Sequence, residues 1–154
     1  MRITIAAVGR AKRGPEAELI AHYLKQIRWD VSVKEIADAP ANLSPDNRKD
    51  REAKTILALL GATDLLVAMD STGKNLTSPE LATLIQKAQK NATKHIVFAI
   101  GGQDGLAPEL LRRAKHTLAF GAATWPHQLL RAMLMEQLFR AYSITIGHPY
   151  HVGH

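Results

Sequence analysis

The stretch HTLAFGAATWPHQLLRAMLMEQL, residues 116–138, decides the fold because it joins a short strand to a long apolar helix. Residues 117–121 are predicted to form a buried strand, and a helix is expected from Pro126 to about Ser143. The residues between them are nearly all small and apolar, whereas turns usually contain Asn, Asp or Ser side chains that bond the backbone. The connection therefore presents bare backbone, which either holds a ligand or only packs against the core.

Strand and helix patterns alternate along the rest of the chain. Apolar runs predict strands at 3–9, 31–37, 64–70 and 95–102, and helices near 15–28, 46–60, 77–89 and 107–114. In the third of these helices, Thr77 and Glu80 have the spacing of a capping box, and Pro79 suits the first turn. The alternation predicts a single α/β domain over residues 1–154, with a mostly parallel sheet flanked by helices. Ligands of such sheets bind at the carboxyl ends of the strands.

Composition excludes several classes of protein. The chain has 154 residues, of which 46% are hydrophobic and 22% charged, as in an ordinary globular domain. Cysteine is absent, which excludes disulfides and thiolate metal sites and is compatible with a reducing cytosol. The amino terminus does not resemble a signal peptide, and no apolar run approaches the roughly 20 residues that a membrane span needs. These features predict a soluble, cytoplasmic protein with no membrane partner.

The charge of the chain is basic and uneven. The net charge is +6, and from Leu110 onward five Lys or Arg residues stand against one acid, Glu136. Five of the seven histidines also lie in this part of the chain. A basic excess favours a polyanionic partner such as a nucleic acid, although a merely basic surface is an equally open interpretation.

Three short motifs are weak when each is taken alone. The glycine turn in FAIGGQDGLAPELL (98–111) does not have the glycine spacing of a dinucleotide fingerprint, which needs a glycine at Ala99 or Gln103, so it either approaches a ligand closely or only forms a tight turn. MDSTGKNLTS (69–78) lacks the first glycine of a phosphate-binding Walker loop and its Ser or Thr. HPYHVGH (148–154) spaces three histidines evenly but has no fourth metal ligand, so a tail that presents Tyr150 to an unpaired base is the better interpretation.

The helix expected at 126–143 is apolar over a wide arc. Such a helix needs cover on more than one side. Its own sheet covers one face, and either a partner subunit or the core of a monomer covers the other. Glu136 and Arg140 stand four residues apart in the order that favours an ion pair, so Arg140 has a structural as well as a catalytic interpretation.

Taken together, the motifs identify a resemblance. AIGGQDGL, TWPHQLLRAMLMEQLFRAYSI and the terminal HPYH, with MRITIAAVGR and LVAMDSTGK, closely resemble the RlmH family of bacterial ribosomal RNA large-subunit methyltransferases, from end to end. The resemblance implies the SPOUT superfamily, whose carboxyl-terminal segment forms a trefoil knot. It implies S-adenosylmethionine as methyl donor, no metal, and N3 of a pseudouridine in the helix 69 stem-loop of 23S rRNA as acceptor, in assembled ribosomes. It also implies a homodimer whose active site draws on both subunits.

The resemblance carries over to individual positions of this chain. The implied donor pocket consists of Met69, Gly101, Phe120, Gly121, Ala122, Ala123, Thr124 and Trp125. Arg140, His148, Tyr150 and His151 match positions expected at the RNA base, and His127 lies close to the knot crossing. Trp125 departs from the Leu or Phe that is common in the family, and the chain ends in Val-Gly-His instead of a charged residue.

The proton acceptor stays open among His148, His151 and Asp70, while Arg140 is expected to stabilise the developing oxyanion. Two other functions compete with the methyltransferase. One is a non-catalytic ribosome-binding module of the same fold. The other is a nucleotide hydrolase that uses the glycine turn at Gly102, for which the sequence has no cluster of metal ligands.

Overall fold

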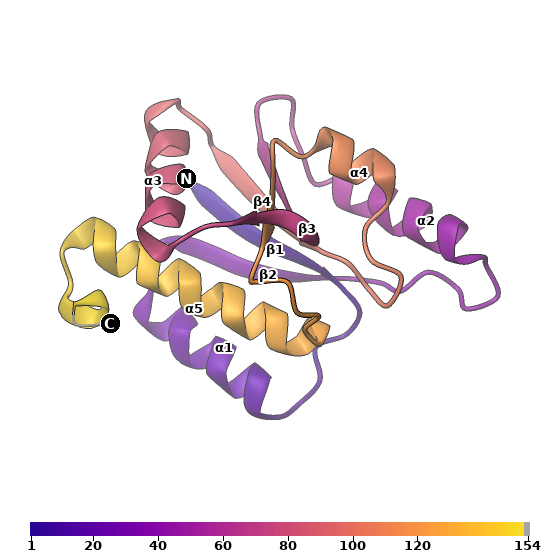
Figure 1. Ribbon diagram of the computed structural model, residues 1–154, viewed down its shortest axis with the longest axis horizontal. Helices are drawn as coiled ribbons and strands as arrows, with labels where there is room; N and C mark the ends of the chain where they lie inside the picture. Colours follow the sequence, from indigo (N-terminus) through magenta and orange to yellow (C-terminus); the bar gives the residue numbers. More distant parts are fainter. Residues whose placement is uncertain (153–154) are drawn as a thin grey trace.

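The computed structural model describes residues 1–152, and it consists of a five-stranded sheet between two layers of helices (Figure 1). The elements in chain order are β1 (Arg2–Val8), α1 (Pro15–Gln26), β2 (Asp30–Ile36), α2 (Pro45–Leu57), β3 (Leu65–Asn75), α3 (Ser78–Lys90), β4 (His95–Ile100), α4 (Pro108–Arg113), β5 (His116–Ala119), α5 (His127–Ile146) and the 3-10 turn η1 (Pro149–His151). Within this part of the chain, no helix has the length and apolar content that crossing a membrane requires.

All five strands run parallel, in the order β2-β1-β4-β3-β5. The predicted α/β class with a parallel sheet is therefore confirmed. From β1 the chain moves outward to β2, whereas from β4 it moves the other way, past β3, to β5. The direction of winding thus changes between β1 and β4, and the loops that follow these two strands diverge at the carboxyl edge of the sheet. Crevices at such switch points are where open α/β sheets bind ligands.

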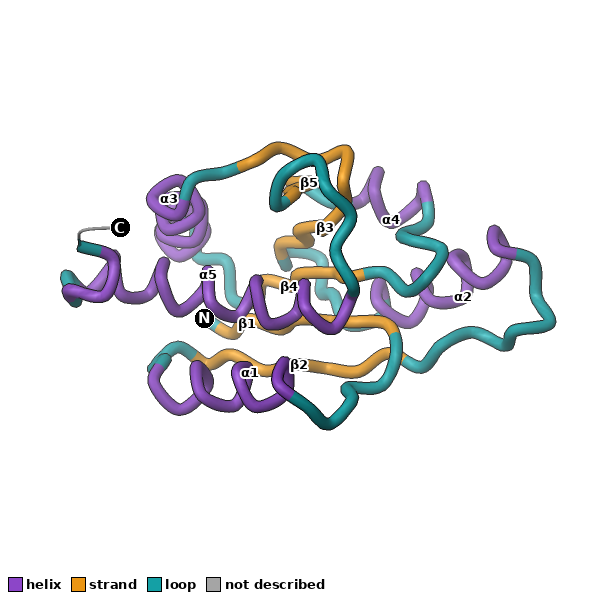
Figure 2. Tube along the Cα trace, turned by 60° about the horizontal axis from the view of Figure 1, so that its bottom comes forward, coloured by secondary structure: helices purple, strands orange, loops and turns teal. Residues whose placement is uncertain are grey.

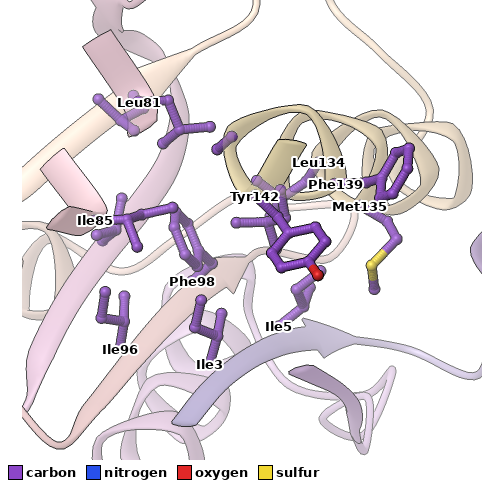
Figure 3. Close-up of a cluster of buried hydrophobic side chains, with 14 of the residues drawn as sticks. Ile3, Ile5, Leu81, Ile85, Ile96, Phe98, Leu134, Met135, Phe139 and Tyr142 are labelled. Carbon is purple, nitrogen blue, oxygen red and sulfur yellow. The ribbon is translucent and has the colours of Figure 1, made fainter. Parts of the chain in front are cut away.

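Side chains of the central strands alternate between two apolar layers. Ile3, Ile5 and Phe98 point toward α1, α3 and α5 and pack with Leu134 and Phe139 of α5 (Figure 3). The intervening residues face the other layer, where α2 and α4 cover them. Figure 2 shows α5 lying across the sheet between α1 and α3. A strand buried on both faces has to be apolar at successive positions, which is why β1 and β4 are continuous apolar runs in the sequence.

The structure covers α5 more fully than the sequence suggested. The sheet lies under the helix, and α1 and α3 pack along its two sides, so no residue from 127 to 145 is exposed. A partner subunit is not needed to cover two of its sides. The helix also runs to Ile146, three residues beyond the predicted end, where Gly147 terminates it in a left-handed conformation (φ 70°).

Local signals set most element ends, with one exception in β3. Thr77 and Glu80 form the predicted capping box at the start of α3. β3 was expected to end at Asp70, yet it continues to Asn75 after an irregularity in its pairing with β5. Gly73 makes this continuation possible, because a Cβ at Gly73 would lie 2.6 Å from the backbone of Leu118. Only glycine permits two backbones to approach this closely.

Candidate functional site

A cavity of about 250 Å³ opens at the carboxyl ends of β3, β4 and β5. Its walls come from the glycine turn after β4, the end of β3, and the loop between β5 and α5, which runs beside the start of α5 in Figures 1 and 2. Of the eight predicted donor-pocket residues, Ala122 is the one that does not line the cavity. The other seven do: Met69, Gly101, Phe120, Gly121, Ala123, Thr124 and Trp125.

The loop between β5 and α5 holds its shape through two hydrogen bonds. The indole Nε1 of Trp125 donates to the carbonyl of Phe120 at 2.9 Å, which closes the loop on itself. The amide of Gly121 donates to Oδ1 of Asn75 at 3.1 Å, which ties the loop to the end of β3. The amide N–H groups of residues 122–125 donate to no group of the described chain. The loop therefore offers free backbone donors beside an apolar wall, as its bare sequence predicted.

Trp125 is 40% exposed and lines the cavity. The ring thus faces the candidate site and not the core. Because the indole N–H is already bonded within the loop, Trp125 contributes ring surface to the cavity and not a free donor.

The glycine turn after β4 is held by an ion pair from a distant part of the chain. Nε and Nη2 of Arg48 donate to the two carboxylate oxygens of Asp104, at 2.7 and 2.9 Å. Nη1 of Arg48 donates to the carbonyl of Leu43, so one guanidinium joins the loop before α2 to the cavity turn. The hydrogen bonds from Arg48 lower the pKa of the Asp104 carboxyl, which therefore stays charged at neutral pH. A planar, bidentate pair of this kind fixes orientation as well as position.

Asp70 also lines the cavity, at the end of the regular part of β3. Its Oδ2 accepts hydrogen bonds from the amide and the hydroxyl of Thr72. The carboxylate thus has a structural role in the turn that follows, in addition to its candidacy as a proton acceptor.

The predicted catalytic residues form a second group, at the carboxyl end of α5. Nη2 of Arg140 donates to Oε1 of Glu136 at 2.6 Å, so the ion pair predicted from their spacing is present. The guanidinium lies 4.7 Å from the centre of the Tyr150 ring, and its Nη1 lies 3.5 Å from Nδ1 of His151. His148 is exposed, and its Nδ1 accepts the amide of Tyr150, which caps η1.

Tyr150 is held within this group by its ring and by its hydroxyl. The ring packs edge-on against Phe139 at 4.7 Å, and the hydroxyl donates to Oε1 of Glu136 at 3.1 Å. Burial, followed by hydrogen bonds with Tyr23 and Glu136, raises the pKa of the Tyr150 hydroxyl. Within one chain the ring is therefore packed and not presented for base stacking.

One chain does not bring the two groups of residues together. Arg140, His148, Tyr150 and His151 do not line the cavity. His127 lines the cavity at the start of α5, and Arg140 follows 13 residues later, which is roughly 20 Å at 1.5 Å per residue. The helix therefore separates the cavity from the residues predicted to handle the acceptor.

A shallow apolar groove of about 350 Å³ runs along α5 between the two groups. It shares Phe120 with the cavity and Glu136 with the carboxyl-terminal group. Its floor consists of Leu129, Ala132 and Met133 of α5, with Leu19 of α1 at the side, 41% exposed.

Sequence reasoning missed several residues that shape the site. Arg48 and Asn75 lie far along the chain from the turns they hold, and no periodicity links them to those turns. Arg131 of α5, which is buried and donates to the carbonyls of Val8 and Gly9, was also missed. An arginine within the apolar stripe of a helix could have indicated such a buried contact. His154 lies outside the described residues, and within those residues no three His, Asp or Glu side chains are grouped to hold a metal ion.

Comparisons of the sequence with known proteins identify the family of this chain. Residues 1–151 match the family described as predicted SPOUT methyltransferase. The ribosomal RNA large subunit methyltransferase H of Rhodopseudomonas palustris (strain BisA53) is 44% identical, over 98% of this chain and 99% of its own length. The protein of the same name from Bradyrhizobium diazoefficiens is 43% identical, with the same coverage. A family match over nearly the whole chain and relatives of this similarity mean that the chain belongs to the SPOUT methyltransferases and, within them, to the RlmH family.

Proposed function

We propose that this protein methylates N3 of a pseudouridine in the helix 69 stem-loop of 23S rRNA, on assembled ribosomes in the cytoplasm, with S-adenosylmethionine as donor. The whole chain, residues 1–154, acts as one domain. The names of the relatives support rRNA as the class of substrate. The observation that carries the donor assignment is the cavity at the carboxyl edge of the sheet, lined by a loop with free backbone amides.

The residues of the cavity fit such a donor. Phe120 and Trp125 supply apolar surface for an aromatic base, and the free amides of residues 122–125 supply donors for its ring nitrogens or carboxylate. Around Gly121 no atom lies within 4 Å of the position of an added Cβ, so the loop leaves open space there. S-adenosylmethionine, when bound, supplies a methyl group bonded to a sulfonium sulfur, and this sulfur is left as a neutral thioether. The chain's own task is therefore orientation, which can supply roughly 7–11 kcal/mol.

The carboxyl-terminal group serves the acceptor. The hydrogen bond with Glu136 raises the pKa of the Arg140 guanidinium, which is therefore a permanent cation. This cation stabilises the negative charge on the base after the imide proton of the base has left. His148 and His151 are the candidate proton acceptors, because His151 lies beside this guanidinium and His148 caps η1, which contains His151. Asp70 is the alternative on the cavity side, although Thr72 occupies one of its oxygens.

A homodimer is the assembly that joins the two groups. We infer that two copies pack through the groove on α5, with their α5 helices antiparallel, so that the cavity of each faces the carboxyl-terminal group of the other. A two-fold axis makes such an arrangement self-complementary and closed. The groove supports this arrangement because it is apolar and reaches from Phe120 to Glu136. We also propose that the segment around β5 and α5 forms the trefoil knot that the SPOUT resemblance implies.

The test is transfer of a labelled methyl group. Ribosomes, large subunits and naked rRNA from a strain that lacks the enzyme are incubated with the protein and labelled donor, and the modified nucleotide is mapped. Label at N3 of a pseudouridine in helix 69 supports the proposal. Donor binding by calorimetry without transfer to any RNA would instead favour the non-catalytic ribosome-binding module.

The Arg140→Ala substitution examines the acceptor side separately. We expect loss of methyl transfer by at least about 100-fold, in the range reported for one stabilising donor, with donor affinity within about twofold of the unsubstituted protein. Arg140→Lys is the matched control, which keeps the charge but loses the bidentate geometry. Full turnover of the Ala variant would remove Arg140 from the catalytic group.

A further inference from the structure

The loop between β1 and α1, residues 9–14 with the sequence GRAKRG, carries three cations and no acid. Arg10, Lys12 and Arg13 are all exposed. Within residues 1–152 none of the three has a carboxylate within ion-pair distance. An exposed cluster of like charges repels itself, so without a partner of opposite charge this loop is electrostatically unfavourable.

The backbone of this loop is nevertheless held at several points. Gln128, in the first turn of α5, accepts the amide of Lys12 with Oε1 at 3.4 Å and donates from Nε2 to the carbonyl of Arg10 at 2.9 Å. Oε1 of Glu35, at the end of β2, accepts the amide of Ala11 at 3.1 Å. The Glu35 carboxylate thus bonds the backbone of the loop and forms no ion pair with its three cations.

A buried arginine holds the base of the same loop. Arg131 of α5 is fully buried, and its Nη2 donates to the carbonyls of Val8 and Gly9, both at 2.9 Å. Its Nε and Nη1 are buried without a hydrogen bond, and burial lowers its pKa, while Glu35 and Asp38 act in the opposite direction. Burying an incompletely bonded guanidinium costs free energy. The two hydrogen bonds from Arg131 fix the point at which the loop leaves the sheet.

The loop also adjoins the cavity. Gly102, which lines the cavity, is so close to β1 that a Cβ there would lie 3.0 Å from Cγ1 of Val8. Gln128, which holds the loop, follows His127, which also lines the cavity. Figures 1 and 2 both show the β1–α1 connection passing beside the start of α5. The three cations therefore stand at the same edge of the sheet as the candidate donor site.

We propose that residues 9–14 form a preorganised phosphate-binding loop that holds the rRNA backbone next to the target nucleotide. The inference rests on the proposed function, because it supplies the RNA contact that the cavity itself lacks. Backbone anchoring lowers the conformational entropy lost on binding, and each phosphate contact releases counterions. The loop would set the position of the RNA and not read its sequence.

The chain offers a matched control for this proposal. Arg112, Arg113 and Lys115 are also three exposed cations within four residues, but they lie in the last turn of α4 and just before β5, at the opposite edge of the sheet from the cavity. Replacing either set with alanine removes the same charge. The comparison separates a located phosphate site from a general effect of net charge.

Binding to ribosomes that lack the modification is measured over a series of salt concentrations for three proteins. These are the unsubstituted chain, Arg10→Ala/Lys12→Ala/Arg13→Ala, and Arg112→Ala/Arg113→Ala/Lys115→Ala. We expect the loop variant to lose roughly 100-fold in affinity near 0.1 M salt and its salt slope to fall by about 2, with the control nearly unchanged. Donor affinity, measured by calorimetry, should stay the same in all three, which also shows that each folds.

Equal losses in both variants, or a loss in the control alone, would overturn the loop assignment. Because the chain has no cysteine, an Arg10→Cys variant accepts a single hydroxyl-radical probe, with Arg112→Cys as its control. Cleavage of 23S rRNA near the methylated loop from position 10 supports the proposal, whereas contact with ribosomal protein alone contradicts it. Ribosome binding through the loop without methyl transfer would contradict the proposed function and would still support the phosphate-binding role of the loop.

Discussion

Asp104 shows how a wall of the cavity depends on side chains that do not line it. Its carboxylate is bound by Arg48, 56 positions earlier in the chain, and both side chains are 14% exposed. The pair links α2 to the turn after β4 and so fixes the wall of the cavity formed by Gly101, Gly102 and Gly105. Arg48 is a positioning residue in this arrangement.

Replacing Arg48 with Met keeps the length of the side chain and removes its charge. We expect the KM for the donor to rise roughly tenfold with kcat less affected, because the turn shifts while the acceptor side is intact. Steady-state kinetics with varied donor give both constants. Asp104→Asn should give a similar rise, and the double variant should be no worse than either single one. Additive losses would show that the two residues act independently.

At the scale of elements, apolar periodicity predicted the strands and helices but not their close approaches. β1 and β4 were recognisable because a strand buried on both faces is continuously apolar. The extension of β3 beyond Asp70 was not, because residues 71–75 are polar and their pairing depends on Gly73 lying against β5. The loop at 120–125 was correctly picked out as bare backbone, whereas its tie to Asn75 is a tertiary contact with no sequence signal.

The approach of β3 to β5 can be tested at Gly73. Gly73→Ala places a Cβ 2.6 Å from backbone atoms of Leu118, which cannot rotate away as a side chain can. We expect a loss of about 1–3 kcal/mol in the free energy of unfolding, measured by urea denaturation. Donor binding should weaken as well, since Leu118 lines the cavity. Gly61→Ala is the control, because its Cβ would lie at 3.4 Å from the Asp64 side chain and would not meet backbone; an equally large loss there would refute the steric argument.

At the scale of the whole molecule, the cavity and the carboxyl-terminal group lie at opposite ends of α5. In the proposed mechanism, neither end is complete for methyl transfer to a base within one chain. Periodicity in the sequence indicated that α5 is apolar over a wide arc, but it did not distinguish the sides that α1 and α3 cover from the flank that lines the groove. That distinction depends on how the layers pack, which only the folded chain defines.

A charge placed in the groove tests the assembly. Met133→Glu puts a carboxylate on the floor of the groove, and an unpaired charge in an apolar interface is strongly unfavourable. We expect sedimentation equilibrium to show a dimer for the unsubstituted chain and a monomer for this variant, with methyl transfer lost and donor binding kept. Thr83→Glu, on the exposed side of α3, should stay dimeric. A monomeric mass for the unsubstituted protein would contradict the proposed arrangement.

Because α5 is one uninterrupted helix, its length sets the distance between the cavity and the carboxyl-terminal residues. Inserting a single residue between His127 and Arg140 would lengthen it by about 1.5 Å and turn everything beyond the insertion by about 100°. The tail would then face away from the groove, whatever the identity of its side chains. In the proposed dimer, the length of this helix is therefore a requirement of the site in its own right.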